Sequence, residues 1–341
     1  MTPVNRRIVL AVRPEGSPGP VNFRRDDQTV PALADGQFLV RNHYLSIDPA
    51  QRGWIATGAN YADPVAIGGV MRALAVGIVT ASRSARYAVG EYLYGWFGWQ
   101  DYCAAVEQLV ISRVQPAQGP VSTGLGLFGI SGVSAYLALT ELGRPRAGET
   151  VLVSTAAGAV GSVVGQIARR LGCRVVGLCG TDEKVSRCVA EFGYHAALNY
   201  RAGLEHERLQ ALCPQGVDVF FDNTSGEIAD AVWPFMNLRG RIVQCGTAAV
   251  AGWDPLPAAP RRERAVLTRR LRHEGFIIFD HLERFPAVIA QLARWLQEGA
   301  LVFHEDVEQG LERAPAALAA IFRGENRGKK MIRITDGERA L

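Results

Sequence analysis

The residues of this chain best suited to chemistry are the small residues of a turn within the stretch 150–184, TVLVSTAAGAVGSVVGQIARRLGCRVVGLCGTDEK. The stretch predicts an apolar strand, a Gly-rich turn, a helix, a second apolar strand and a polar loop. Ala156, Gly158 and Gly161 occupy the three positions of the G-x-G-x-x-G pattern, with Ala in the first. The second position lets backbone N–H groups approach a pyrophosphate, and the third lets the helix pack on the strand. Because a strand precedes the turn and a helix follows it, we expect a bound dinucleotide rather than a purely structural turn.

The end of the second strand indicates which dinucleotide is preferred. A site specific for NAD usually has an acidic residue there, about 20 residues after the turn, that binds the ribose hydroxyls. Here the strand ends at Gly180, which leaves room for a 2′-phosphate, and Lys184 can pair with that phosphate as a point charge. Asp182 and Glu183 suit the first turn of the next helix, with Thr181 as its cap. The sequence therefore favours NADPH over NADH.

Metal-assisted chemistry is not expected from the residues available. A catalytic zinc needs three protein ligands and a structural zinc needs four, but the N-terminal part offers only His43 and Cys103 with scattered carboxylates. Residues 68–77 contain no ligand, and no tyrosine begins a Tyr-x-x-x-Lys pair. We therefore expect no metal and assign no catalytic acid.

This set of residues favours alkene reduction over carbonyl reduction. Hydride transfer to an isolated carbonyl produces an alkoxide that such a site would stabilise poorly. Hydride transfer to the β-carbon of an activated alkene produces an enolate, whose oxygen ordinary hydrogen-bond donors can stabilise. Water can then protonate the α-carbon.

The elements that would position these residues fall into two kinds. Short runs broken by Gly, Pro and Asp in the first 120 or so residues predict a small β-rich domain, at 38–44, 74–81 and 102–111. From about Thr123, apolar strands are expected at 151–154, 174–178, 196–200, 217–222, 241–245 and 276–279. Helical patterns separate them at 159–171, 182–192, 204–213, 226–237 and 260–273. Such alternation predicts an α/β fold with a doubly wound parallel sheet.

The C-terminal part predicts a discontinuous first domain. After a helix at 282–298, the chain has a further strand, a helix at 313–323 and a last strand at 329–334. We expect this tail to return to the N-terminal domain. The predicted domains are therefore 1–122 with 302–341, and 123–301 for the nucleotide.

Bulk properties exclude several other classes. A net charge of +4 over 341 residues gives no case for nucleic-acid binding, and we interpret the Arg-rich stretch 261–272 as an amphipathic surface helix. The six cysteines form no C-x-x-C pair, which favours free thiols in a reducing compartment. The apolar run 8–12 is too short for a signal peptide or a membrane span, so we expect a cytoplasmic location.

Several motifs, spread nearly from end to end, resemble one known family: YLSIDPAQRGW (44–54), VMRALAVG (70–77), GWQDY (98–102), AAGAVGSVVGQ (156–166), FDN (221–223) and RGENRGK (323–329). They resemble the zinc-independent medium-chain dehydrogenase/reductases, specifically the prostaglandin reductase and curcumin reductase group. The resemblance implies a GroES-like β-barrel domain packed on a Rossmann domain that binds NADPH. It also implies reduction of α,β-unsaturated ketones, aldehydes or thioesters.

The resemblance also implies roles for individual residues. The pyrophosphate would be held by Gly158, Ala159, Val160 and Gly161. The 2′-phosphate would lie near Lys184 and Tyr200. The ribose and nicotinamide would be lined by Asn223, Cys245, Gly246, Thr247, Phe276, Ile277 and Ile278, with Asn326 closing over the nicotinamide end. The substrate pocket would contain Tyr44, Arg52 and Trp253. A purely structural role is an alternative for Tyr44 and Asn223, and strand core for Cys245 and residues 276–278.

Two positions depart from the family pattern, and the first of them leaves the substrate preference open. Ala251 stands where the family usually has a tyrosine, with Trp253 nearby, and Ser131 stands where a proline is common. Trp253 would provide an aromatic wall but no proton. A quinone reductase and a non-catalytic NADPH-binding redox sensor remain alternatives. A homodimer joined through an apolar edge strand at 276–279 is also expected.

Overall fold

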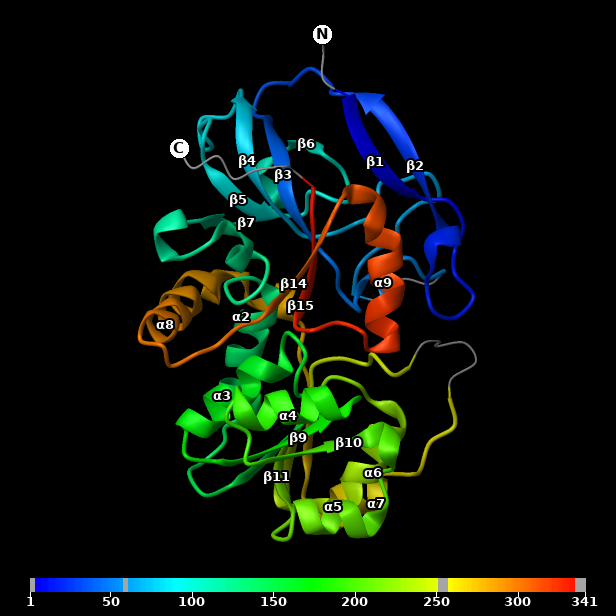
Figure 1. The fold of residues 1–341 in the computed structure, drawn as a ribbon, viewed down its shortest axis with the longest axis vertical. Coiled ribbons are helices and arrows are strands. Elements are labelled where there is room, and N and C mark those ends of the chain that lie inside the picture. Colours follow the sequence, from blue (N-terminus) through cyan, green and yellow to red (C-terminus); the bar gives the residue numbers. More distant parts are fainter. Residues whose placement is uncertain (1–3, 58–60, 251–256, 335–341) are drawn as a thin grey trace. The chain divides into compact units, whose positions relative to one another are not determined.

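The chain divides into two compact units. In a computed structural model, which describes residues 4–57, 61–250 and 257–334, contacts separate one unit formed by Met1–Gly129 and Glu305–Leu341 from a second formed by Ile130–His304 (Figure 1). The boundaries expected from the sequence, after residues 122 and 301, fall a few residues before these.

The first unit is built from β-strands. A two-stranded antiparallel sheet contains β1 (Val4–Leu10) and β2 (Phe23–Thr29). A seven-stranded sheet has the order β14-β15-β3-β4-β5-β7, with β6 paired to β3. Its strands are β3 (Phe38–Ser46), β4 (Ala75–Ser82), β5 (Tyr92–Gly95), β6 (Tyr102–Ala105), β7 (Val110–Val114), β14 (Glu305–Gln309) and β15 (Lys329–Arg333). The C-terminal tail belongs to this unit because β15 pairs antiparallel with β3, Met331 opposite Ser46.

One predicted strand of the first unit is in fact two. The run 102–111 divides into β6 and β7, separated by a 3₁₀ turn at Glu107–Leu109. The two halves pair with different partners, since β6 lies against β3 and β7 against β5. Periodicity within one run cannot reveal such a change of neighbour.

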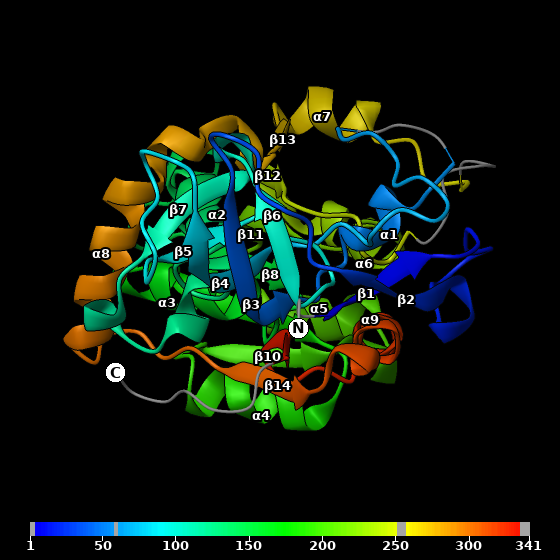
Figure 2. The same ribbon diagram turned by 90° about the horizontal axis from the view of Figure 1, so that it is seen from above.

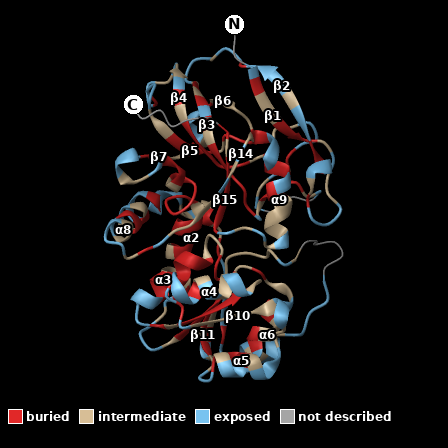
Figure 3. Ribbon diagram, viewed as in Figure 1, coloured by how far each residue is buried: buried red, intermediate tan, exposed pale blue. Residues whose placement is uncertain are grey.

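Helical structure in the first unit is sparse. Its helices are α1 (Gln51–Trp54) and α9 (Ala314–Arg323). Short 3₁₀ turns lie at Pro20–Asn22, Pro116–Gln118, Val121–Gly124 and Leu311–Arg313. Large side chains fill its core, which is red in Figure 3: Phe38, Trp54, Tyr94, Phe97 and Trp99.

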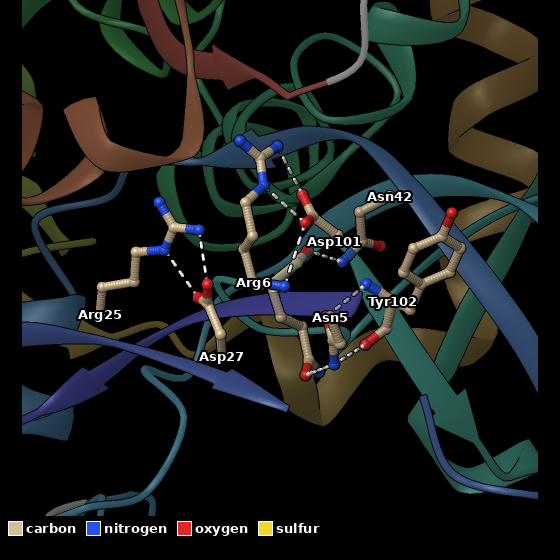
Figure 4. A network of polar contacts seen from close by, with 8 residues as sticks. Asn5, Arg6, Arg25, Asp27, Asn42, Asp101 and Tyr102 are labelled. Carbon is tan, nitrogen blue, oxygen red and sulfur yellow. Dashed lines mark hydrogen bonds and ion pairs between the residues drawn. The ribbon is translucent and has the colours of Figure 1, made fainter. Parts of the chain in front are cut away.

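Polar contacts attach β1 to the larger sheet (Figure 4). The Arg6 guanidinium donates two hydrogen bonds to the Asp101 carboxylate, at 2.8 and 3.0 Å. Asn5 and Tyr102 exchange hydrogen bonds of 2.9 Å between the Asn5 amide and the Tyr102 backbone. Asn42 on β3 donates to the Gln100 carbonyl at 2.9 Å. The contacts of Asn5 and Arg6 connect residues 95–97 positions apart in sequence.

The second unit has the predicted parallel sheet. Its order is β10-β9-β8-β11-β12-β13 and every pair is parallel. The strands are β8 (Thr150–Ser154), β9 (Arg174–Cys179), β10 (Ala196–Asn199), β11 (Val217–Asp222), β12 (Met236–Gln244) and β13 (Arg272–Gly275). The direction of winding reverses between β8 and β11, which is where doubly wound sheets bind ligands.

Helices cover both faces of this sheet. One face packs on a cluster that includes Leu209 of α5 (His206–Leu212) and Val232 of α6 (Gly226–Val232). α3 (Gly161–Arg170) packs on β8 and β9, and α4 (Asp182–Ala190) on β9 and β10. α2 (Ile130–Leu137), which continues into a π-helical turn at Ala138–Gly143, contacts α3 and α8 (Phe285–Gln297), as can be followed in Figure 2. No helix within the described residues is long and apolar enough to cross a membrane.

The strand predicted at 276–279 is wrong. The edge strand is β13, whose four residues are all exposed. Phe276 donates its backbone N–H to the Gln244 carbonyl at 3.0 Å, and a 3₁₀ turn, Ile278–Arg284, follows. Phe276 and Ile278 are buried, although they lie beyond the end of the exposed strand β13. An edge strand has only one neighbour, so an apolar run is a poor guide to its position.

Several other boundaries also differ from expectation. The predicted helix 260–273 is reduced to α7 (Glu263–Arg269), none of whose residues is buried. The predicted helix 226–237 ends at Val232, because a 3₁₀ turn containing Pro234 leads directly into β12. Cys245 follows β12 instead of ending it, and Tyr200 follows β10.

Candidate nucleotide-binding site

The Gly-rich turn joins β8 to α3 and leaves backbone donors available. Gly158 donates its N–H to the Thr155 carbonyl at 2.8 Å, and Ser162 donates to the Gly158 carbonyl at 3.0 Å. Within the described part of the chain, no acceptor is present for the N–H groups of Ala159, Val160 and Gly161. Donors at the start of a helix, together with its dipole, bind anions. The turn therefore fits a pyrophosphate.

Close backbone packing explains why Gly161 is a glycine. A Cβ atom at Gly161 would lie 2.4 Å from the Thr155 carbonyl oxygen and 2.9 Å from the Ala156 Cα. The neighbouring Tyr194 side chain fixes the same turn, since its hydroxyl donates to the Gly161 carbonyl at 2.7 Å. Tyr194 also covers Gly165, where a Cβ atom would lie 2.0 Å from its ring. The sequence suggested the role of Gly161 but not that of Tyr194.

A group of cationic side chains lies at the end of β9. A Cβ atom on Gly180 would lie 2.9 Å from the Tyr200 hydroxyl and 3.6 Å from Arg201 Nε. Lys184, in the first turn of α4, is half-buried. Burial lowers the pKa of its ammonium group, and the charges of Arg201 and Arg187 lower that pKa further. An anion bound here would relieve this repulsion, which is the property that a 2′-phosphate site needs.

Local hydrogen bonds explain why the acidic residues beside Lys184 do not oppose the binding of a phosphate. Thr181 caps α4 by accepting the Lys184 backbone N–H at 3.2 Å. Asp182 lies in the first helical turn and accepts a hydrogen bond from the Asn199 side chain at 3.0 Å. Arg201 was not predicted as a site residue, although its place immediately after Tyr200 is a signal in the sequence.

A second group of predicted residues meets at the ends of β8, β11 and β12. The Asn223 side chain donates to the Ser154 carbonyl at 2.8 Å. Cys245 donates its N–H to the Asp222 carbonyl at 2.8 Å. A Cβ atom on Gly246 would lie 2.8 Å from the Asn223 carbonyl oxygen. Thr247 follows Gly246 directly, so the structure brings Asn223, Cys245, Gly246 and Thr247 together.

A buried carboxylate that the sequence did not single out holds these strand ends in place. Asp222, fully buried, accepts hydrogen bonds of 2.8–3.1 Å from the Ser154 and Thr224 hydroxyls, from the Thr224 and Ser225 backbone N–H groups, and from the Gln244 amide. A buried carboxyl group needs its hydrogen-bond donors, so it holds the groups that donate to it in one arrangement. Asp222 therefore acts as a positioning residue through Gln244 and through Ser154, whose hydroxyl accepts the Asn223 backbone N–H at 2.8 Å.

Two further features complete this end of the sheet. Phe276 stacks on His281, with ring centroids 5.0 Å apart and planes within 6°. Ile277 is half-buried and Ile278 is buried. Burial raises the pKa of the Cys245 thiol to about 12, so this cysteine is neutral and apolar in character.

Three of the remaining predicted residues, Tyr44, Arg52 and Asn326, belong to the first unit. Tyr44 is buried on β3, and Arg52 of α1 donates to the Gly16 carbonyl at 2.5 Å. Asn326 donates to the Gly328 carbonyl at 2.9 Å. Trp253 and Ala251 lie outside the described residues. Burial lowers the pKa of the Arg52 guanidinium.

A buried network fixes the segment that carries Tyr44 and Arg52. Lys329 of β15, whose side chain is 1% exposed, donates to the Ser46 hydroxyl at 2.6 Å and pairs with Asp48. Gln51, also buried, accepts the Asp48 backbone N–H at 3.0 Å. Lys329 and Asp48 both lie in the family-like motifs, but nothing in the sequence indicates that they pair. Within the described residues, no group of three or more His, Cys, Asp and Glu could hold a metal ion.

Comparison with known proteins identifies the family. Residues 6–112 match the family described as the N-terminal domain of oxidoreductase, and residues 159–294 match the one described as zinc-binding dehydrogenase. The NADPH-dependent curcumin reductase of Escherichia coli (strain K12) is 38% identical, over 97% of each chain. Prostaglandin reductase 1 of Sus scrofa is 36% identical, over 93% of this chain and 95% of that protein. The crystal structure of CurA from Vibrio vulnificus in complex with NADPH has a TM-score of 0.92 at 37% identity, over 97% and 100% of the two chains. The chain belongs to the medium-chain dehydrogenase/reductase family, in its zinc-independent group of curcumin and alkenal reductases.

Proposed function

We propose that the protein reduces the C=C bond of α,β-unsaturated ketones, aldehydes or thioesters with NADPH. The choice of NADPH as cofactor is supported by one group of residues beside the Gly-rich turn: Gly180, Lys184, Tyr200 and Arg201. The substrate class is supported by the curcumin and prostaglandin reductases that resemble this chain over nearly its full length.

Each part of the second unit has a task in this proposal. The N–H groups of residues 159–161 bind the pyrophosphate, and Lys184 with Arg201 neutralises the 2′-phosphate. Residues 223, 245–247 and 276–278 form the wall for the ribose and nicotinamide. NADPH supplies the hydride when bound.

Tyr44, Arg52 and Trp253 remain our candidates for the substrate pocket, and Asn326 our candidate for closing the nicotinamide end.

A substrate panel tests the activity. Purified enzyme with NADPH is expected to consume the nicotinamide absorbance with a conjugated enone but not with the matched saturated ketone. The product should be two hydrogens heavier by mass and keep its carbonyl. Oxidation of simple alcohols with NADP⁺, while enones stay intact, would contradict the proposal. Conversion of a quinone to its hydroquinone, with no enone turnover, would favour a quinone reductase instead.

We also propose a homodimer that pairs through the edge strand β13. The support is its position at the end of the sheet, where its outer N–H and C=O groups face outward and all four side chains are exposed. Light scattering at micromolar concentration is expected to give twice the 36.9 kDa chain mass. His273→Pro, which removes an edge N–H, should give monomers, whereas Arg264→Ala on α7 should not. A wild-type protein of single-chain mass would contradict this assembly.

The location is a separate proposal. All six cysteines are free thiols, which suits a reducing compartment such as the cytoplasm.

A further inference from the structure

Two cysteines beside the proposed cofactor site lie close together, and neither has a role in the proposed reaction. The Sγ atoms of Cys179, at the end of β9, and Cys188, on α4, lie 3.4 Å apart. Both residues are buried, at 1% and 0% exposure. A disulfide needs an S–S separation of about 2.05 Å. A shift of little more than an ångström would therefore bring the two sulfurs to bonding distance.

Electrostatics distinguishes the two thiols from each other. The hydrogen bond from Cys188 lowers the pKa of the Cys179 thiol, and the N–H groups of Ala157 and Ala156 and the charge of Lys184 lower it further. The same hydrogen bond, with burial, raises the pKa of Cys188. Cys179 is thus the thiol that ionises first, and nucleophilic attack needs the thiolate.

The other cysteines provide the contrast. Burial raises the pKa of Cys103 and Cys245 to about 12, and that of Cys173 and Cys213 to about 11. None of these four has a hydrogen-bonded cysteine partner within the described residues. Reactivity toward an oxidant is therefore concentrated in one pair.

The position of the pair connects it to cofactor binding. Residues 180–187, between the two cysteines, include Gly180, the Thr181 cap and Lys184. The Cys179 sulfur also faces the backbone of the Gly-rich turn at Ala157. A bond between the sulfurs would draw α4 toward the end of β9 and displace Lys184 from the 2′-phosphate position.

We propose that Cys179 and Cys188 form a modification site that hydroperoxides oxidise to a disulfide, and that this disulfide weakens NADPH binding through the displacement of Lys184. The inference rests on the proposed NADPH site. The Cys179 thiolate attacks the terminal peroxide oxygen, so an S–O bond forms, the O–O bond breaks and the alcohol or water leaves with a proton. The Cys188 sulfur then attacks the resulting sulfenic acid, and water leaves as the S–S bond forms. Two thiols lose two electrons, which the hydroperoxide accepts.

Binding and oxidation compete in this scheme. The 2′-phosphate and the Cys179 thiolate both use the charge of Lys184, so each weakens the other by the same factor. Because both sulfurs are buried, the peroxide must wait for α4 to open locally from the sheet. A phosphate held by Lys184 in the first turn of α4 makes that opening rarer. Bound NADPH therefore protects the pair.

The test uses the full-length, reduced protein and hydrogen peroxide. Two of the six thiols should be lost, and a peptide map should locate one 179–188 cross-link. The dissociation constant for NADPH, measured by nicotinamide fluorescence, should rise at least tenfold while that for NADH stays constant. Dithiothreitol should restore the number of free thiols and the dissociation constant for NADPH. Saturating NADPH should slow the loss of thiols.

Variants separate this chemistry from general damage. After peroxide, Cys188→Ala and Cys179→Ala should keep their NADPH affinity, with near-UV circular dichroism reporting their fold, whereas Cys213→Ala should respond as the wild type does. A map without the 179–188 cross-link, or a cross-link that leaves NADPH affinity unchanged, would overturn the inference. Equal affinity of the reduced protein for NADPH and NADH would instead reject the NADPH proposal, while the peptide map would still report on the thiol pair.

Discussion

Replacing Lys329 with methionine is expected to destabilise the first unit by about 3–5 kcal/mol. Methionine keeps an unbranched apolar stem but removes the ammonium group that donates to Ser46 and pairs with Asp48. Asp48, whose side chain is 9% exposed, would then lose the ammonium group that pairs with it. The cost comes from this uncompensated buried charge.

Urea unfolding followed by tryptophan fluorescence measures this effect, because Trp54 and Trp99 are buried in the same unit. Arg83→Met is the matched control: it breaks an Arg–Asp pair of that unit whose side chains are 57% and 89% exposed, and should cost about 1 kcal/mol or less. Adding Asp48→Asn to Lys329→Met should recover part of the loss. Equal destabilisation by the two single variants would show that the buried pair does not hold the segment.

The parts of the fold that could be predicted are those encoded within one element. β8, β9 and β11 are central in a parallel sheet, so each is a continuous apolar run that stands out in the sequence. The turn before α3 could also be predicted, because its glycines are required by contacts with residues only a few positions away in the sequence. β13 was misplaced because an edge strand can be polar, as Arg272–Gly275 is.

The parts of the site that could not be predicted depend on contacts between elements. Arg201 follows β10 yet approaches Gly180 at the end of β9. The Ser154 hydroxyl on β8 and Asp222 on β11 meet at 3.0 Å although 68 residues separate them. Tyr194 reaches back to Gly161 in the same way. Each of these contacts depends on the order of the strands in the sheet, which a local sequence pattern cannot predict.

Replacing Lys184 with alanine is expected to weaken NADPH binding by about 1.5–3 kcal/mol, roughly ten- to hundredfold, and to leave NADH within twofold. The loss is one charge-assisted contact to the 2′-phosphate, which NADH lacks. Arg201 remains beside Gly180, so the preference for NADPH should diminish without reversing. Fluorescence titration of both cofactors gives the two dissociation constants.

The control removes the same charge elsewhere in the second unit. Arg170, in the last turn of α3, has its guanidinium over the Trp295 ring at 5.0 Å, and Arg170→Ala should leave both dissociation constants unchanged. The double variant Lys184→Ala with Arg201→Ala should bring NADPH and NADH to similar affinity, because both cations near Gly180 are then absent. If Lys184→Ala weakened the two cofactors equally, the lysine would act on the shape of α4 rather than on the phosphate. The preference for NADPH would then have to arise from Tyr200 and Arg201 alone.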